Sequence, residues 1–179
     1  MSVRIRYFVH GTTVDNEAHK AAGWNDVHLS QKGIDRVKAL KESIDMDRID
    51  IVISSDLIRA IDTADYVFKG EKEILHDARI RECNYGALNG EDSSLVIYEE
   101  HIKEPFDGGE SLLDVEKRLR DFCNYLKENY SGKTVALVAH KAPQLALEVI
   151  TKGKTWEEAI ESDWRKTKAW QPGWEYELK

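Results

Sequence analysis

The 179-residue chain is long enough for a sizeable hydrophobic core, and we expect residues 1–179 to form a single domain. The formal net charge is −7 and Lys and Arg are dispersed among Asp and Glu, which argues against nucleic acid as a partner. No apolar run approaches the roughly 18 residues that a membrane span requires, and Arg4 and Arg6 interrupt the N-terminal apolar run where a signal peptide would be continuous. We therefore expect a cytoplasmic protein without a membrane anchor.

Apolar periodicity predicts strands that alternate with helices along the chain. The expected elements are a strand at 3–9, a helix at 30–43, a strand at 51–53, a helix at 57–68, a short strand at 73–76, a short helix at 94–103, a helix at 111–126, a strand at 134–139, a helix at 143–150, a short helix at 155–165 and an edge strand at 174–178. Ser30, Ser111 and Thr155 mark helix starts, the last two with an acidic residue three positions on. The polar segment 12–27 and the glycine-bearing segment 77–92 predict loops.

This alternation predicts an α/β fold with a mainly parallel central sheet and helices on both faces. Such folds bind ligands beyond the carboxyl ends of the strands. His10, Arg59 and His140 each come at or soon after the end of an apolar run, so we expect them to meet at that edge.

These residue types suit phosphate chemistry. A neutral imidazole attacks a phosphate ester well when cationic or N–H donors neutralise the oxygens of the transferred group. His10 is the candidate nucleophile, Arg59 offers a bidentate fork, and His140 can donate a hydrogen bond to the same group. Glu82 is the candidate acid that protonates the leaving alkoxide. A single His, Arg or Glu in such a position is more often structural than catalytic. Only the sequence pattern around all four residues can therefore distinguish a catalytic site from a set of structural residues.

Six short segments carry a more specific signal. They are VHGTT at 9–13, GWNDVHLSQKG at 23–33, SSDLIRAIDTA at 54–64, RECNYGALNG at 81–90, GGES at 108–111 and VAHKAP at 138–143. Together they closely resemble the motifs of the histidine phosphatase superfamily, the phosphoglycerate mutase-like proteins, along nearly the whole chain.

The resemblance implies a three-layer αβα sandwich and assigns roles to the four candidates. His10 would take the phosphoryl group as a phosphohistidine, Arg59 and His140 would bind it, and Glu82 would donate the proton. The family implies neither a metal nor an organic cofactor. The implied partner is a small phosphorylated substrate.

We expect Gly11, Thr13 and Asn16 to contact the substrate, Asn16 on the strength of the resemblance. Two positions depart from the family pattern. Val9 replaces the arginine that normally precedes the nucleophile, and Lys141 replaces the glycine after the second histidine. We hypothesise that the Lys141 ammonium partly replaces the missing guanidinium, as a point charge rather than a planar fork.

By resemblance, a small insertion around 84–110 would cover the pocket. Family mutases are typically longer there, so this compact chain resembles a phosphatase rather than a phosphoglycerate-type mutase, which remains an alternative. A phosphate-ligand binding protein with weak or no turnover is the stronger alternative, because Val9 removes a catalytic-site arginine. The sequence leaves the substrate open, and it permits a monomer or a homodimer.

Two other classes of protein lack their signatures. The first strand is followed by HGTTVD, which does not contain the G-x-G-x-x-G of a dinucleotide-binding turn. The six histidines are dispersed, and neither H-E-x-x-H nor C-x-x-C occurs, so no zinc site is expected.

Overall fold

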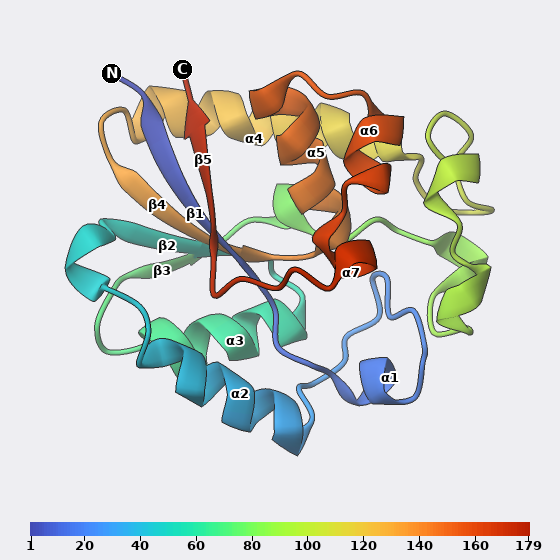
Figure 1. Ribbon diagram of the computed structural model, residues 1–179, viewed down its shortest axis with the longest axis horizontal. Coiled ribbons are helices and arrows are strands. Elements are labelled where there is room, and N and C mark those ends of the chain that lie inside the picture. Colours follow the sequence, from blue (N-terminus) through green and yellow to red (C-terminus); the bar gives the residue numbers. More distant parts are fainter.

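The structure is a computed structural model that describes all residues from 1 to 179. A five-stranded sheet runs through the molecule in the order β3-β2-β4-β1-β5 (Figure 1). The strands are β1 (Val3–Val9), β2 (Ile51–Ser54), β3 (Ile74–His76), β4 (Thr134–Ala139) and β5 (Trp174–Leu178). Strand β2 pairs in parallel with β3 and with β4, and β4 pairs in parallel with β1. Strand β5 pairs antiparallel with β1 at one edge of the sheet. The predicted α/β class and the predicted edge strand are confirmed.

Helices cover both faces of this sheet. They are α1 (Val14–Glu17), α2 (Gln31–Lys41), α3 (Ile58–Phe68), α4 (Leu112–Asn129), α5 (Lys141–Lys152), α6 (Trp156–Glu161) and α7 (Trp164–Thr167). Figure 1 shows α2 and α3 on one face, with α4, α5 and α6 on the other, which gives the expected three layers. Short 3₁₀ helices occur at Met46–Arg48, Ala78–Ile80, Gly86–Leu88, Ser93–Leu95 and Tyr98–Glu100.

The alternation of side chains along the strands divides the core in two. In β1, Ile5 and Tyr7 pack into a cluster with α4, α5 and α6, whereas Phe8 packs with α2 and α3. All six residues of β4 are buried, as a central strand with helices on both faces requires. The carboxyl ends of β1 and β4 are therefore held side by side.

The predicted helix starts coincide with observed caps. The Ser30 side chain accepts a hydrogen bond from the Gly33 amide at the start of α2. Ser111 and Thr155 form reciprocal capping boxes at the starts of α4 and α6. Each cap fixes the residue at which its helix begins.

The helix predicted at 94–103 is wrong. The segment forms two 3₁₀ turns instead, with extended backbone at Val96 and Ile97 between them. Both residues are β-branched and favour extended backbone. The break turns Tyr98 inward, where it is 3% exposed and its hydroxyl lies 2.8 Å from the hydroxyl of Tyr85.

Three other segments differ in detail from the prediction. The helix predicted at 155–165 is two helices, because Asp163 turns inward and its side chain caps α7 by accepting from the Arg165 amide. Pro143 lies in the first turn of α5, as expected, but α5 continues past the predicted end at Ile150 to Lys152. The loop at 12–27 contains the single-turn helix α1.

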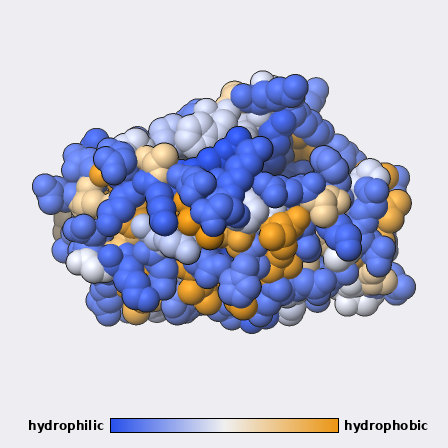
Figure 2. All heavy atoms as spheres, turned by 90° about the horizontal axis from the view of Figure 1, so that it is seen from below, coloured by the Kyte–Doolittle hydropathy of each residue, from blue (hydrophilic) through white to orange (hydrophobic).

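The view in Figure 2 shows a mostly hydrophilic surface in which hydrophobic side chains form small, separate groups. None of the helices combines the length and the apolar composition that crossing a membrane needs.

Candidate active site

A cavity of about 310 Å³ opens at the carboxyl ends of β1 and β4. Five of the eight candidate residues line it, namely His10, Asn16, Arg59, Glu82 and Lys141. A larger hollow of about 910 Å³ lies at the other end of these strands and contains none of the candidates. The smaller cavity is therefore the candidate active site, because it brings together the residues whose chemistry suits a phosphate group.

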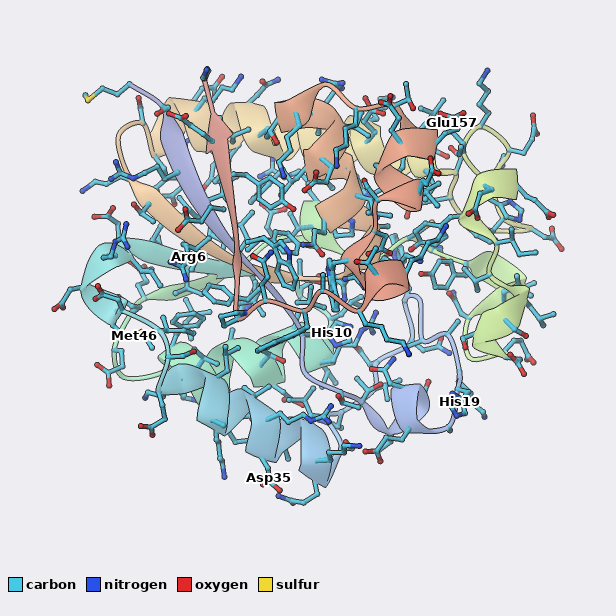
Figure 3. All side chains as sticks on the ribbon, viewed as in Figure 1. Arg6, His10, His19, Asp35, Met46 and Glu157 are labelled. Carbon is cyan, nitrogen blue, oxygen red and sulfur yellow. The ribbon has the colours of Figure 1, made fainter.

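His10 follows the last residue of β1, and its amide donates to the carbonyl of Ala139 at 3.0 Å. Its Nδ1 lies 2.7 Å from the carbonyl oxygen of Gly11. Because a carbonyl only accepts, Nδ1 carries the proton and Nε2 has the free lone pair. Figure 3 shows His10 near the centre of the molecule, below the strands. This tautomer is the one that a nucleophilic imidazole needs.

The surroundings of His10 keep its ring neutral. Burial, together with the positive charges of Arg59 and Arg165, lowers the pKa of His10 to about 3, although the hydrogen bond to Gly11 acts in the opposite direction. A neutral imidazole is therefore present throughout the physiological pH range.

Arg59 lies in the first turn of α3 and is 2% exposed. Its guanidinium donates to the carbonyls of Asn25 at 3.1 Å and Gly23 at 2.7 Å, which ties the loop after β1 to the site. Burial lowers the pKa of Arg59, but an arginine remains charged at physiological pH. A chain of hydrogen bonds runs from the Gly11 amide through Thr63 Oγ1 to the Arg59 carbonyl, so the segment that carries His10 is tied to the start of α3.

Glu82 lies at the start of α5 and acts as its cap. Its Oε1 accepts from the amides of Cys83 and Ala142, both at 2.9 Å, and from the Tyr98 hydroxyl at 3.3 Å. Its Oε2 accepts only from the Lys141 amide, at 3.1 Å. Oε2 is therefore the oxygen with capacity for a further partner, and Glu82 lines the cavity.

His140 is fully buried beside His10. Its ring centroid is 5.1 Å from that of His10, and both of its ring nitrogens lack a hydrogen-bond partner. Burial holds the pKa of His140 well below its usual value, and the charge of Arg59 acts in the same direction. An imidazole that is buried, neutral and unpaired is unusual in a purely structural position. His140 does not line the cavity, so its contact with phosphate stays a prediction.

The remaining predicted substrate contacts divide into two kinds. Asn16 lines the cavity, but its side chain also accepts from the Thr13 amide in the capping box of α1. Thr13 is fully buried as the other half of that box, and Gly11 carries the two backbone hydrogen bonds described above. A Cβ at Gly11 would lie 2.6 Å from Val37, which explains the glycine. Gly11 and Thr13 position the site from outside the cavity wall.

Lys141 lies on the cavity wall together with Arg165. The Lys141 ammonium is 4.3 Å from the ring centroid of Tyr98 and 3.6 Å from Oδ2 of Asp163, while Oδ1 of Asp163 is 2.9 Å from Nη1 of Arg165. The Asp163 side chain is 1% exposed, so one buried carboxylate orients two cations. Burial lowers the pKa of Lys141, and the charge of Asp163 opposes this.

The cavity concentrates positive charge in an acidic protein. Its basic side chains are those of Lys20, Arg59, Lys141 and Arg165, against the single carboxylate of Glu82. Such local charge attracts an anion despite the net charge of −7. Nowhere in the chain do three or more His, Cys, Asp or Glu side chains converge as a metal-binding group.

The sequence did not point to Arg165, Asp163 or Tyr98 as site residues. Ser162-Asp163 does contain a helix-start signal, because Asp is a common N-cap, but a four-residue helix carries no periodicity. No local signal shows that α7 returns to the end of β1. Tyr98 belonged to the segment wrongly predicted as a helix.

The fold and the cavity define an α/β protein with a positively charged cavity at the carboxyl ends of its strands. The chain belongs to the Histidine phosphatase superfamily (branch 1), whose family model matches residues 7–149. The predicted family is confirmed.

The chain is similar to a phosphatase and to a mutase. It is 28% identical over 150 residues to phosphoserine phosphatase 1 of Hydrogenobacter thermophilus, covering 77% of this chain and 71% of the relative. It is 26% identical over 136 residues to the 2,3-bisphosphoglycerate-dependent phosphoglycerate mutase of Pseudoalteromonas atlantica, covering 76% of this chain but only 52% of the mutase.

Solved structures show the same fold. Mycobacterial hydrolase 1 superposes with a TM-score of 0.80 at 24% identity, covering 90% of this chain and 85% of the hydrolase. A mycobacterial glucosyl-3-phosphoglycerate phosphatase in complex with VO3 superposes with a TM-score of 0.76 at 26% identity, covering 89% of this chain and 86% of the phosphatase.

Proposed function

We propose that the protein is a metal-independent phosphatase that hydrolyses a small phosphomonoester through a phosphohistidine on His10. The observation that carries this proposal is the arrangement of His10, whose Nδ1 is fixed by the Gly11 carbonyl while Nε2 is free. The nucleophile shares its cavity with the buried arginine Arg59 and with one carboxyl group, that of Glu82. The phosphatases among its relatives support hydrolysis as the outcome.

In the first step, Nε2 of His10 attacks phosphorus and the bond from phosphorus to the ester oxygen breaks. The electron pair of that bond leaves with the alkoxide, which takes a proton from the carboxylic acid form of Glu82. Arg59 neutralises the nonbridging oxygens of the transferred group. The products of this step are the free alcohol, phosphohistidine and the Glu82 carboxylate.

In the second step, water attacks the phosphohistidine and the bond between phosphorus and Nε2 breaks. The Glu82 carboxylate takes the proton that the water loses, through the oxygen that accepts only from Lys141, and inorganic phosphate leaves. His10 returns to its neutral form with its Nδ1 still hydrogen-bonded to the Gly11 carbonyl, so the site is ready for another cycle.

The first test is hydrolysis of p-nitrophenyl phosphate and a panel of small phosphomonoesters by chelator-treated protein, comparing wild type with His10→Ala. We expect the substitution to abolish turnover, and acid-labile, base-stable phosphate to accumulate on wild type only. Wild-type protein that binds phosphate without turnover would favour the binding-protein alternative. Conversion of 3-phosphoglycerate to an isomer without phosphate release would favour the mutase alternative.

Glu82→Gln tests the proposed acid separately. The nitrophenolate leaving group needs little protonation, whereas an alkoxide needs it fully. We expect hydrolysis of alkyl phosphates to fall by about 10² to 10⁴ and that of p-nitrophenyl phosphate to fall much less. An equal loss with both ester types would contradict the role of Glu82 as the acid.

A further inference from the structure

Part of the cavity wall comes from outside the segment that defines the family. The family model matches residues 7–149, yet Arg165 of α7 lines the cavity together with His10 and Arg59. In Figure 1, α7 lies beside the end of β1, although about 155 positions separate the two in the chain. The C-terminal segment thus adds a guanidinium to the site.

Arg165 is held firmly by two buried acceptors. Its Nη1 lies 2.9 Å from Oδ1 of Asp163, and its Nη2 donates to Oε1 of Gln144 at 3.2 Å. Asp163 is 3% exposed and Gln144 2% exposed, so neither acceptor depends on solvent for its position. The guanidinium also stacks over the ring of Trp164, 4.4 Å from its centroid. These two bonds use two of its five N–H donors, which leaves donors for a ligand.

Arg165 approaches the site from the side of the sheet to which position 9 belongs. Along β1, Ile5, Tyr7 and Val9 share the face that packs against α4 and α5. Val9 itself lines the cavity with Arg165. His10 lines the same cavity, and the charge of Arg165 is among the causes that lower the pKa of His10.

We propose that Arg165 binds the nonbridging oxygens of the phosphoryl group that His10 receives, as the second guanidinium of a site in which position 9 is valine. This inference rests on the proposed phosphatase activity and assigns the residue that completes its anion site. Arg165 can present a planar fork to two oxygens, whereas the neighbouring Lys141 supplies a point charge. Asp163 is a positioning residue, since it orients both cations from a buried place.

The experiment compares Arg165→Met with Lys166→Met. Lys166 is the next residue of α7, is largely exposed and pairs with Glu99 at 3.0 Å outside the cavity, so its substitution makes the same charge change without touching the site. Two quantities are measured for each variant, the Kd for inorganic phosphate by calorimetry and kcat/KM for p-nitrophenyl phosphate. A third variant, Val9→Arg combined with Arg165→Met, returns a guanidinium to position 9.

We expect Arg165→Met to lower kcat/KM by about 10² to 10³ and to weaken phosphate binding about tenfold. Lys166→Met should match wild type in both measurements, and Val9→Arg should recover part of the loss in the double variant. A Kd for phosphate and a kcat/KM in Arg165→Met equal to those of Lys166→Met would overturn the proposal.

Two further results separate this inference from the proposed function. If wild type binds phosphate but hydrolyses no ester, the phosphatase proposal fails, while the phosphate Kd values still decide the role of Arg165. If Arg165→Met does not fold by circular dichroism, Arg165→Gln replaces it, because its amide can still donate to Asp163. An unchanged phosphate Kd in that variant would overturn the proposal in the same way.

Discussion

The protonation of His10 is set by its immediate neighbours. Burial and the charges of Arg59 and Arg165 all disfavour the imidazolium, and only the hydrogen bond to the Gly11 carbonyl favours it. In the proposed mechanism, an imidazole held in this way needs no separate base to remove a proton from it. The arginines would then serve the site twice, by keeping the imidazole neutral and by attracting the anion that it attacks.

This arrangement predicts how His10 titrates. Its pKa of about 3 leaves the ring neutral down to about pH 4, so NMR of the imidazole nitrogens should show no protonation of His10 between pH 8 and pH 5. The Arg165→Met variant lacks one of the positive charges that lower the pKa of His10, so this pKa should rise. The acidic limb of the pH profile of kcat/KM should then move to higher pH. A midpoint for His10 near the ordinary 6.5 in wild type would contradict this account.

At the scale of elements, the site depends on where α5 and α7 begin. The start of α5 presents the amides of Lys141 and Ala142 to the Glu82 carboxyl group, which satisfies donors that a helix start leaves free. The start of α7 is capped by Asp163, whose side chain reaches both cations on the cavity wall. Each helix start thereby fixes a charged group of the site as well as the path of the chain.

Asp163→Asn should destabilise the protein, because it leaves Arg165 and Lys141 without their buried counter-charge. Both cations are partly exposed, so we expect a loss of about 1–3 kcal/mol in the free energy of unfolding, less than for a fully buried pair. Urea unfolding at pH 7 measures this change. Asp121→Asn, an exposed position in the middle of α4, serves as the control and should lie within about 0.5 kcal/mol of wild type. Equal stability of the two variants would show that Asp163 is not the counter-charge.

Sequence patterns predicted the parts of this protein that follow local rules. Strand ends placed His10 and His140 correctly at one sheet edge, and the capping boxes at Ser111 and Thr155 marked two helix starts. The sequence did not predict Arg165 and Tyr98 as site residues, because their positions depend on contacts between segments that are distant in the chain. The apolar periodicity of the sequence does not predict that Tyr98 turns toward Glu82, or that α7 lies near the end of β1.

At the scale of the whole molecule, two buried histidines couple the stability of the fold to pH. His10 and His140 lie side by side after the ends of β1 and β4, and the pKa of each is lowered mainly by burial. The unfolded chain binds a proton at each of these residues near pH 6.5, whereas folded His10 does so only near pH 3. Unfolding is therefore coupled to proton uptake below pH 6.5.

The sign of this coupling gives the final prediction. As the pH falls from 6.5 toward 3, the unfolded state binds more protons than the folded state, so stability declines and the His10 contribution levels off below pH 3. We expect His10 to account for a loss of about 1–3 kcal/mol by pH 4, and His140, whose pKa is also lowered by burial, to act in the same direction. Urea unfolding at several pH values would measure the slope in wild type, His10→Asn and His140→Asn.

Each of these variants should show a smaller decline in stability between pH 6.5 and pH 4, whatever its stability at neutral pH. The matched control is His19→Asn, because His19 is exposed and asparagine tolerates its positive φ of 56° (Figure 3). Its slope should equal that of wild type. If all four proteins lose stability in parallel over this range, the two buried histidines do not control the acid response, and the neutral state of His10 would need another explanation.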